Sequence, residues 1–332
     1  MDYISNEWIL ENAHFFSQKK VVIIAGAGIS VSSGIPDFRS KTGLFQDIKN
    51  KYKIKGEELF SYKFGIESRT RKIYLEYICN LKRLINNSNP SYTHKFFKWY
   101  AQITSLRVYT QNIDSLEEKG GLTKDNLVYL HGNLKYLRCL YCGSQSEFNN
   151  PTDILNSPKC TICAKSQNER LKNIPKYLHT NIIHYHQDHP DSDLISKCIK
   201  KDSNLDLLIV VGTSLNVFGV KNMVKYFSKF CKNRIFVSLS NCSSSMKKYF
   251  THFYKGTSDD FFRHVKKSVE NYDLDISLQD ISIHEENIEK KVLDTESRKP
   301  TKKNILKKMK RLSLTKEDIV NNFIVLNNSK FI

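Results

Sequence analysis

Two pairs of cysteines with the same spacing are the strongest chemical signal in the sequence. Cys139 and Cys142 form one Cys-x-x-Cys pair, and Cys160 and Cys163 form the other. This arrangement is typical of a tetrahedral thiolate zinc site, and four protein ligands leave no open position on the metal. We therefore expect one structural zinc ion. A redox-active Cys-x-x-Cys would need only one pair, and zinc ribbons also occur in nucleic-acid binders, so this module alone does not separate an enzyme from a binding protein.

A second candidate is the histidine-rich segment 182-IIHYHQDHP-190. If residues 182–187 form a β-strand, period-two alternation points His184 and His186 to the same face, where they could supply half of a metal site. The segment by itself leaves three interpretations open: a metal site, a catalytic pair, or a strand whose usual residues have been replaced.

A glycine-containing turn, 26-GAGIS-30, follows an apolar run, which is where an α/β fold places a dinucleotide. A Rossmann fingerprint would have a third glycine at position 31, where Val31 stands, so the bare motif is weak. The loop that continues it, 34-GIPDFRS-40, is too long for a tight Rossmann turn. It could close over a ligand, with Arg39 on a phosphate or ribose and Phe38 against a ring.

Two polar segments follow other strand candidates. The segment 110-TQNID-114 places hydrogen-bonding side chains at the carboxyl end of a strand, and His131 comes directly after the apolar run 127-LVYL-130 and before Gly132. An isolated histidine is more often a structural residue than a catalyst. The position of His131 nevertheless suits a general base, which must lie at a cleft with its ring free.

Four apolar runs predict strands that are buried on both faces of a parallel sheet. They are Lys19 to Ala25, Leu106 to Thr110, Leu205 to Val211 and Arg234 to Leu239. The helical patterns between them are Glu57 to Leu84, His94 to Gln102 and Val220 to Phe230. This alternation predicts a doubly wound α/β fold, whose ligands bind at the carboxyl ends of the strands. The Cys-rich segment, about Arg138 to Asn173, interrupts the alternation, so we expect it to be an inserted small module.

The chain is strongly basic, with 52 Lys and Arg against 34 Asp and Glu and a formal charge of +18. Such an imbalance suggests a polyanionic environment such as nucleic acid or chromatin. A Lys- and Asn-rich composition from an AT-rich genome is the alternative, and runs such as Asn149-Asn150 support it. The basic run 298-RKPTKKNILKKMKR-311 indicates either a nuclear localisation or nucleic-acid-contacting segment, or a solvated helix or disordered tail. The apolar run 319-IVNNFIVL-326 could dock onto the core.

Other classes of protein are disfavoured. No apolar run approaches the roughly 20 residues that span a bilayer, and the N-terminal segment MDYISNEWIL lacks the basic region of a signal peptide. We expect an intracellular, soluble protein without a membrane association. In a reducing compartment the remaining cysteines would be ordinary buried thiols; they are Cys79, Cys198, Cys231 and Cys242.

Taken in order, GAGIS, GIPDFRS, TQNID, HG, the paired Cys-x-x-Cys and 212-GTSL-215 resemble the sirtuins, a family of NAD-dependent protein deacylases. The resemblance covers roughly Lys19 to Val269. Finer features are similar to the fungal branch that acts on a lysine in the histone core: 43-GLF-45 with 56-GEELF-60, 111-QNIDSLEEKGGL-122, 129-YLHGNLKYLRC-139 and 212-GTSLNVFGVK-221.

The resemblance implies an α/β fold: a doubly wound parallel Rossmann-like sheet with a small zinc-ribbon module and a helical module inserted. The catalytic domain would be residues 1–268, with the helical module at about 46–90 and the zinc module at about 136–178. Residues 269–332 would form a charged, partly basic C-terminal tail.

The resemblance also implies a reaction. The carbonyl oxygen of an acyl-lysine attacks the nicotinamide ribose of NAD, and nicotinamide leaves. His131 would be the general base that activates a ribose hydroxyl for attack on the resulting imidate, with Asn112 and Asp114 as the other catalytic residues. The products would be free lysine, nicotinamide and O-acyl-ADP-ribose.

Matching positions imply the contacts. The cofactor-binding residues would be Gly26, Ala27, Gly28, Ser30, Pro36, Asp37, Phe38, Arg39, Gln111, Asn112, Asp114, Gly212, Thr213, Ser214 and Asn241. The zinc ligands would be Cys139, Cys142, Cys160 and Cys163, remote from the chemistry. The substrate-side residues would be Ile182, Ile183, Tyr185, His186 and Phe218.

Three departures from the family pattern stand out. Ser115 replaces a glycine that many relatives carry, and Phe218 replaces a proline that is common in the fungal branch. The largest departure is 185-YHQ-187, where sirtuins carry Phe-Gly-Glu. We expect the His186 side chain to occupy room that relatives leave for close backbone approach, and so to narrow the peptide groove.

Three functions therefore compete. The favoured one is a nuclear NAD-dependent lysine deacetylase that acts on histone or another basic nuclear protein. The altered segment 185–187 motivates a second, a chromatin-bound scaffold or NAD sensor that has lost peptide turnover. Mono-ADP-ribosyl transfer, the third, would use the same pocket. Chromatin or nucleic acid is a possible partner through the basic tail.

Overall fold

The central sheet of the computed structural model has seven parallel strands in the order β1-β10-β9-β8-β2-β3-β4. The strands are β1 Asp2–Tyr3, β2 Lys20–Ala25, β3 Ser105–Thr110, β4 Leu127–Tyr129, β8 Leu207–Val211, β9 Asn233–Ser238 and β10 His252–Lys255. The structure describes residues 1–165 and 176–272. The predictions for the tail segments 298–311 and 319–326 fall outside these residues.

The strand β2 is buried on both faces because its side chains alternate between two hydrophobic clusters. Val21 and Ile23 pack in one cluster, with the aromatic residues of α6, whereas Val22 and Ile24 pack in the other, with α11. The helices that cover the sheet are α1 Asn6–Glu11, α6 Tyr92–Ile103, α10 Ser192–Lys201, α11 Phe218–Phe227 and a helix over residues 258–272. The predicted doubly wound Rossmann-like sheet is confirmed.

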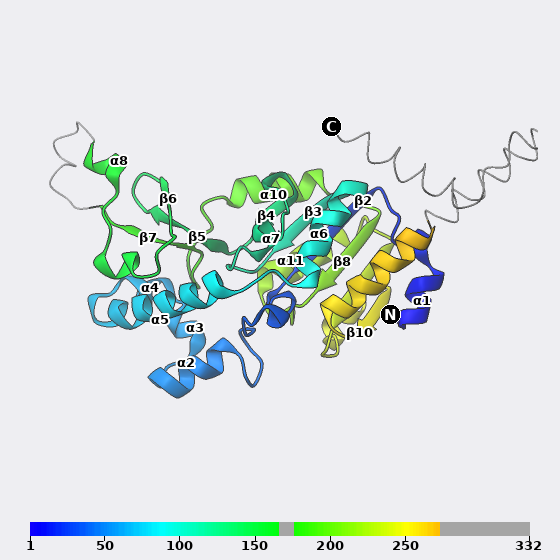
Figure 1. Ribbon diagram of the computed structural model, residues 1–332, viewed down its shortest axis with the longest axis horizontal. Coiled ribbons are helices and arrows are strands. Elements are labelled where there is room, and N and C mark those ends of the chain that lie inside the picture. The colour runs from blue at the N-terminus through cyan, green and yellow to red at the C-terminus, as the bar shows by residue number, and fades with distance from the viewer. Residues whose placement is uncertain (166–175, 273–332) are drawn as a thin grey trace, which may run out of the picture. The chain divides into compact units, whose positions relative to one another are not determined.

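The cysteine pairs lie in and beside a second, three-stranded antiparallel sheet, which Figure 1 shows apart from the central sheet. Its strands are β5 Gly132–Cys139, β6 Gln145–Glu147 and β7 Leu178–Ile182, in the order β6-β5-β7. The short helix α8 Thr161–Ala164 follows Cys160. This small sheet and its four cysteines agree with the predicted zinc ribbon.

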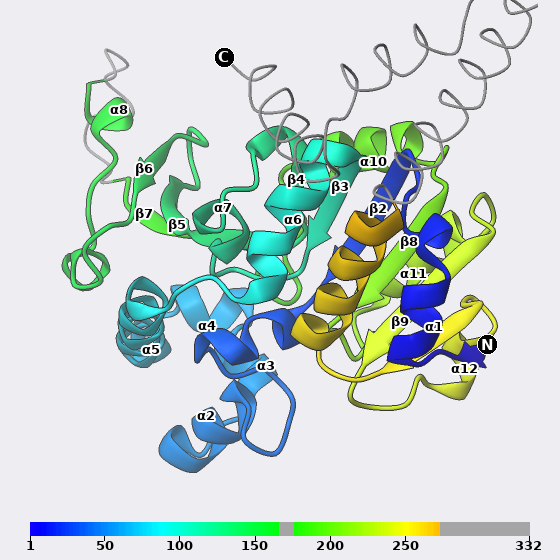
Figure 2. The ribbon, with the colours of Figure 1, turned by 45° about the vertical axis from the view of Figure 1, so that its right-hand side comes forward.

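The helical module comprises α2 Leu44–Tyr52, α3 Gly56–Leu59, α4 Tyr62–Ile66 and α5 Ser68–Asn87. Figure 2 shows α4 and α5 near the β5-β7 sheet and α2 farther away, and buried side chains of the helical module and the sheet belong to one hydrophobic cluster. The prediction of a single helix from Glu57 to Leu84 was wrong. The chain breaks at Ser61, whose hydroxyl caps α4 by accepting from the Phe64 N–H, and again at Glu67, which is extended.

The strand considered over residues 182–187 does not form. The strand β7 ends at Ile182, and His186 has a φ of 66°, in the left-handed region that ends regular pairing. Tyr185 instead makes an isolated parallel bridge with Ser61. The alternation that would have placed His184 and His186 on one face does not exist.

The remaining elements are short. They are the helices α7 Leu116–Lys119 and α12 Ser244–Lys247 and the 3-10 helices Ala13–Phe15, Ala27–Ile29, Val31–Ser33, Lys124–Asn126 and Asp153–Asn156. Among the helices of the described residues, none combines the length and the apolar character that crossing a bilayer requires. The residues Met1–Tyr272 form one compact unit, and the helix over 258–272 crosses the boundary predicted at residue 268.

Candidate active site

The carboxyl ends of three adjacent strands bring the predicted polar segments together. Ala25 at the end of β2 is in register with Thr110 of β3 on one side and with Val211 of β8 on the other. The segments GAGIS, TQNID and GTSL therefore begin side by side. In a doubly wound sheet this switch point between strands is where ligands bind.

Two glycines allow the first and third segments to interlock. The Gly28 N–H donates to the Gly212 carbonyl at 2.8 Å, and a Cβ on Gly28 would lie 2.7 Å from the Gly212 Cα. Gly212 itself has a φ of 64°, a conformation that L side chains rarely adopt. The backbone approach at this end of the sheet is possible because both positions lack a side chain.

A pocket opens beside these segments. Its walls combine the predicted residues Ala27, Ser30, Pro36, Phe38, Asn112 and Asp114 with the apolar residues Ile35, Leu44, Leu81, Ile85 and Ile113. The apolar residues could not be predicted from the sequence because they carry no chemical signal. Leu44, Leu81 and Ile85 are core residues of the helical module, Ile35 lies in the loop 34–40 and Ile113 in the TQNID segment, and only the fold brings them together at the pocket.

Ser30 ties the glycine turn to the TQNID segment. Its hydroxyl donates to Asp114 Oδ2 at 2.8 Å and accepts from Asn112 Nδ2 at 3.3 Å. The amide oxygen of Asn112 is buried and has no partner among the described residues. Because a buried, unmade hydrogen bond is costly, this oxygen is suited to accept a hydrogen bond from a bound ligand.

Two buried carboxyl groups lie next to each other under this network. Asp114 Oδ1 accepts from the Leu116 N–H and Oδ2 from Ser30, whereas Glu117 accepts one hydrogen bond, from Thr110 at 2.6 Å. Burial raises the pKa of both groups, and burial together with the neighbouring Asp114 charge raises the pKa of Glu117 to about 8. We assign the negative charge to Asp114, which has more donors, and the proton to Glu117.

A hydrogen bond to the backbone fixes the tautomer of His131. Its Nδ1 lies 2.9 Å from the Gln111 carbonyl oxygen. Because a carbonyl oxygen only accepts, Nδ1 carries the proton and Nε2 keeps its lone pair. Burial lowers the pKa of His131 below its ordinary value of 6.5, and this favours the neutral ring near pH 7. Nε2 has no hydrogen-bond partner among the described residues.

Other predicted contacts are in different environments. Asp37 Oδ1 accepts from the N–H groups of Arg39 and Ser40 and so closes its own loop. Arg39 pairs with Glu57 at 3.0 Å and donates to the Tyr185 hydroxyl at 3.1 Å. Gln111 Oε1 accepts from the Thr213 hydroxyl at 3.3 Å, which joins β3 to β8. Ser214 and Asn241 are exposed.

The substrate-side residues follow β7 past His131. Ile182 is buried at the end of the strand, and the Ile183 N–H donates to the His131 carbonyl at 2.8 Å. Tyr185 is half-buried, whereas His186 is exposed. Phe218 is the first residue of α11, and its side chain lies outside the described part of the chain.

The four cysteines of the paired motifs form a compact cluster. The sulfur atoms of Cys139 and Cys163 lie 3.7 Å apart, and those of Cys142 and Cys160 lie 3.6 Å apart. Tetrahedral zinc with Zn–S bonds of about 2.3 Å separates its sulfur ligands by roughly 3.8 Å. The cluster therefore fits a structural zinc ion. The Ser144 hydroxyl lies 3.0 Å from the Cys142 sulfur and 3.2 Å from the Cys160 sulfur, a contact that the motif does not reveal.

We expect removal of zinc to destabilise the protein. The metal joins β5 to the start of α8, so treatment with a strong chelator should lower the midpoint of thermal unfolding by more than about 5 °C. The double variant Cys142→Ser with Cys160→Ser should lose zinc by elemental analysis. Cys198→Ser, which lies outside the cluster, should keep it. An unchanged unfolding midpoint after complete zinc removal would contradict the structural role.

The buried Glu117 should make stability depend on pH. A carboxyl group whose pKa is raised in the folded state keeps its proton there while the unfolded chain ionises, so stability falls as pH rises from the ordinary value of 4.5 toward about 8. Glu117→Gln removes this titration. The variant should gain stability over the wild type between about pH 5 and about pH 9, as measured by denaturant unfolding. Glu58→Gln, at an exposed position, is the matched control.

Comparison with known proteins identifies relatives over most of the chain. NAD-dependent histone deacetylase HST3 of Candida albicans is 32% identical over 76% of this chain and 60% of its own length. NAD-dependent protein deacetylase hst4 of Schizosaccharomyces pombe is 36% identical over 63% and 56%, and NAD-dependent histone deacetylase HST4 of Saccharomyces cerevisiae is 33% identical over 69% of each. The chain spans less than two thirds of the length of the first two.

Solved structures have the same fold. The crystal structure of a Sir2 homolog–NAD complex superposes with a TM-score of 0.66 at 23% identity, over 81% of this chain and 96% of the other. A second Sir2 enzyme structure gives a TM-score of 0.63 at 22% identity, over 81% and 100%. Residues 26–219 match the Sir2 family. The resemblance to sirtuins, and to their fungal branch, is confirmed, and the chain belongs to the Sir2 family.

Proposed function

We propose that the protein is an NAD-dependent protein lysine deacetylase that releases nicotinamide and O-acetyl-ADP-ribose. The observation that carries the proposal is the fixed tautomer of His131. Its Nδ1–H is used by the carbonyl of Gln111, the residue before Asn112 of the pocket wall, and this leaves Nε2 free to act as a base. The relatives named as NAD-dependent deacetylases support the same activity.

The pocket suits the cofactor of this reaction. NAD, when bound, supplies the ribose carbon that accepts the acyl oxygen and the nicotinamide that departs. The residues that would hold it are Gly26, Ala27, Gly28, Ser30, Pro36, Asp37, Phe38, Arg39, Gln111, Asn112, Asp114, Gly212, Thr213, Ser214 and Asn241. Close packing of Gly28 on Gly212, with no Cβ between them, keeps the glycine turn tight at the end of β2, where a doubly wound fold binds a dinucleotide.

Each of the three catalytic residues has a separate task in this proposal. His131 Nε2 takes the proton from a ribose hydroxyl. The unpartnered amide oxygen of Asn112 accepts a hydrogen bond from the ligand, and Ser30 holds the Asn112 side chain in place. The charge on Asp114 makes the floor of the pocket negative, which favours positive charge that develops as nicotinamide leaves.

The activity should depend on His131. His131→Ala removes the base, so nicotinamide release with NAD and an acetylated histone peptide should fall by at least about a hundredfold. NAD binding by calorimetry should remain. The exposed His14→Ala is the matched control and should keep full activity. Equal turnover by the wild type and His131→Ala would contradict the proposal.

The same assay separates the competing functions. NAD binding without turnover across an acylated-peptide library would favour a chromatin-bound scaffold or sensor. Transfer of ADP-ribose to a protein acceptor, detected by mass, would favour mono-ADP-ribosyl transfer. Deacetylated peptide together with O-acetyl-ADP-ribose would exclude both alternatives as the main activity.

We propose that the substrate is a histone or another basic nuclear protein and that the protein acts in the nucleus. The names of two relatives include histone deacetylase, and the charge of +18 is compatible with a chromatin environment. The basic run 298–311 is the candidate localisation segment. A fluorescent fusion should accumulate in the nucleus, and deletion of residues 298–311 should disperse it into the cytoplasm. Unchanged nuclear accumulation of the deletion would contradict a role for this segment.

A further inference from the structure

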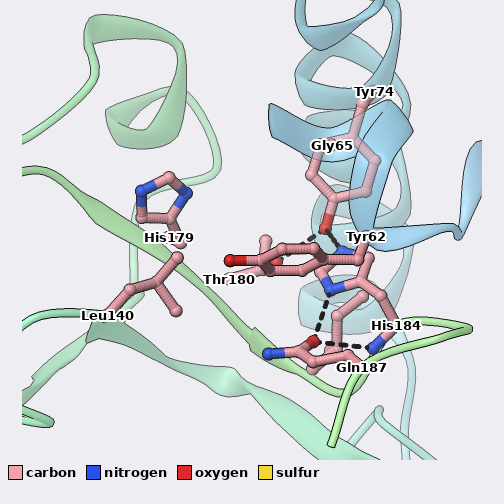
Figure 3. A pocket seen from close by; sticks show the side chains of 9 residues that line it. Tyr62, Gly65, Tyr74, Leu140, His179, Thr180, His184 and Gln187 are labelled. Carbon is pink, nitrogen blue, oxygen red and sulfur yellow. Dashed lines mark hydrogen bonds between the residues drawn. The ribbon is translucent and has the colours of Figure 1, made fainter. Parts of the chain in front are cut away.

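His184 occupies a small pocket between the helical module and β7, where both of its ring nitrogens are used (Figure 3). Nδ1 lies 3.1 Å from the Gln187 side-chain oxygen, which also accepts the His184 backbone N–H at 3.0 Å. Nε2 lies 2.8 Å from the Tyr74 hydroxyl, and the Tyr74 hydroxyl lies 2.6 Å from Thr180 Oγ1. The ring therefore has no nitrogen left for a metal ion or for proton transfer to a substrate.

The chemistry of these groups fixes the direction of every hydrogen bond. The Gln187 oxygen only accepts, so Nδ1 carries the imidazole proton. Burial lowers the pKa of His184, and in the neutral ring Nε2 is then an acceptor. Tyr74 must donate to Nε2, and Thr180 must donate to the Tyr74 oxygen. The result is a directed chain of side chains from β7, through α5, to the segment 183–187.

The same segment is fastened through its backbone as well. The Tyr185 N–H donates to the Phe60 carbonyl at 2.9 Å, and the Tyr62 N–H donates to the Tyr185 carbonyl at 3.1 Å. At the start of the segment, the Ile183 N–H donates to the His131 carbonyl. Residues 183–187 are thus hydrogen-bonded to His131 at one end and to the helical module through Tyr185. The His184 side chain adds a further hydrogen bond to the helical module, through Tyr74.

We propose that Tyr74, His184 and Gln187 are positioning residues, whose hydrogen-bonded chain holds segment 183–187 in the place where the acylated peptide binds. The proposal rests on the proposed deacetylase function. It assigns to the helical module a control of peptide affinity that requires no contact with peptide or cofactor. It also explains why Gln187 can stand where the family has Glu, since the amide keeps the acceptor oxygen that His184 needs.

Three substitutions test the chain of hydrogen bonds. Tyr74→Phe removes one hydroxyl, Gln187→Met removes the acceptor at similar size, and Gln187→Glu keeps an acceptor oxygen. We expect the first two to raise the KM for peptide roughly five- to tenfold, the effect of one lost buried hydrogen bond. The KM for NAD should stay within about twofold. Gln187→Glu should have the same KM for peptide as the wild type.

The matched control lies in the same pocket. Tyr62→Phe removes a hydroxyl that has no hydrogen-bond partner among the described residues, so the KM for peptide should not change. Thermal unfolding and NAD calorimetry of each variant identify any general loss of structure. Equal KM values for Tyr74→Phe and Tyr62→Phe would overturn the proposal, and so would a Gln187→Met variant that matches the wild type.

A second measurement separates this proposal from the proposed function. Hydrogen–deuterium exchange of residues 182–190 should quicken in Tyr74→Phe and Gln187→Met and stay unchanged in Tyr62→Phe, whether or not the protein turns peptide over. If the wild type has no turnover, the proposed function fails, and peptide affinity by calorimetry takes the place of KM. Unchanged exchange would overturn the positioning role. Faster exchange with unchanged peptide affinity would overturn its link to the substrate.

Discussion

The position of β2 between β3 and β8 is the constraint on which the site depends. Ala25 is in register with both Thr110 and Val211, so three chain segments that are far apart in sequence leave the sheet at one point. The polar residues that follow can then hydrogen-bond to one another, as Ser30 does to Asp114 and Thr213 to Gln111. A shift of one residue in either strand pair would turn these side chains to the opposite face of the sheet.

The strands that meet at this point were predictable because they follow from burial. The four long strands are apolar on both faces, and such runs have few other solutions than the middle of a parallel sheet. The cysteine spacing was equally informative, since it specifies ligands directly. The strands β1 and β6 have no comparable sequence pattern, because their side chains are exposed. They are strands only because their backbones pair with β10 and β5.

The sequence-based expectations differ from the structure where contacts between distant segments override the local hydrophobic pattern. The amphipathic run 57–84 reads as one helix, but the exchange of backbone hydrogen bonds between Tyr62, Phe60 and Tyr185 requires an extended turn at Ser61. The same exchange stops β7 at Ile182, because Tyr185 pairs with the helical module instead of β5. The apolar wall of the pocket was missed for a related reason: Leu81 and Ile85 are ordinary helix core residues until the fold sets them opposite Asn112.

The backbone at His186 bears on whether the altered segment 185–187 has lost its function. A φ of 66° favours glycine and costs a histidine roughly 1–2 kcal/mol, so the contacts around the turn must offset this cost. His186 adopts this conformation with an exposed side chain, while its neighbours Tyr185 and His184 are held by hydrogen bonds to Phe60, Tyr62 and Gln187. The neighbouring Gln187 keeps an acceptor where the family has a carboxylate. The surrounding contacts therefore hold His186 in a conformation that glycine favours. This argues that segment 183–187 keeps a defined structure, which now depends on the hydrogen bonds of His184.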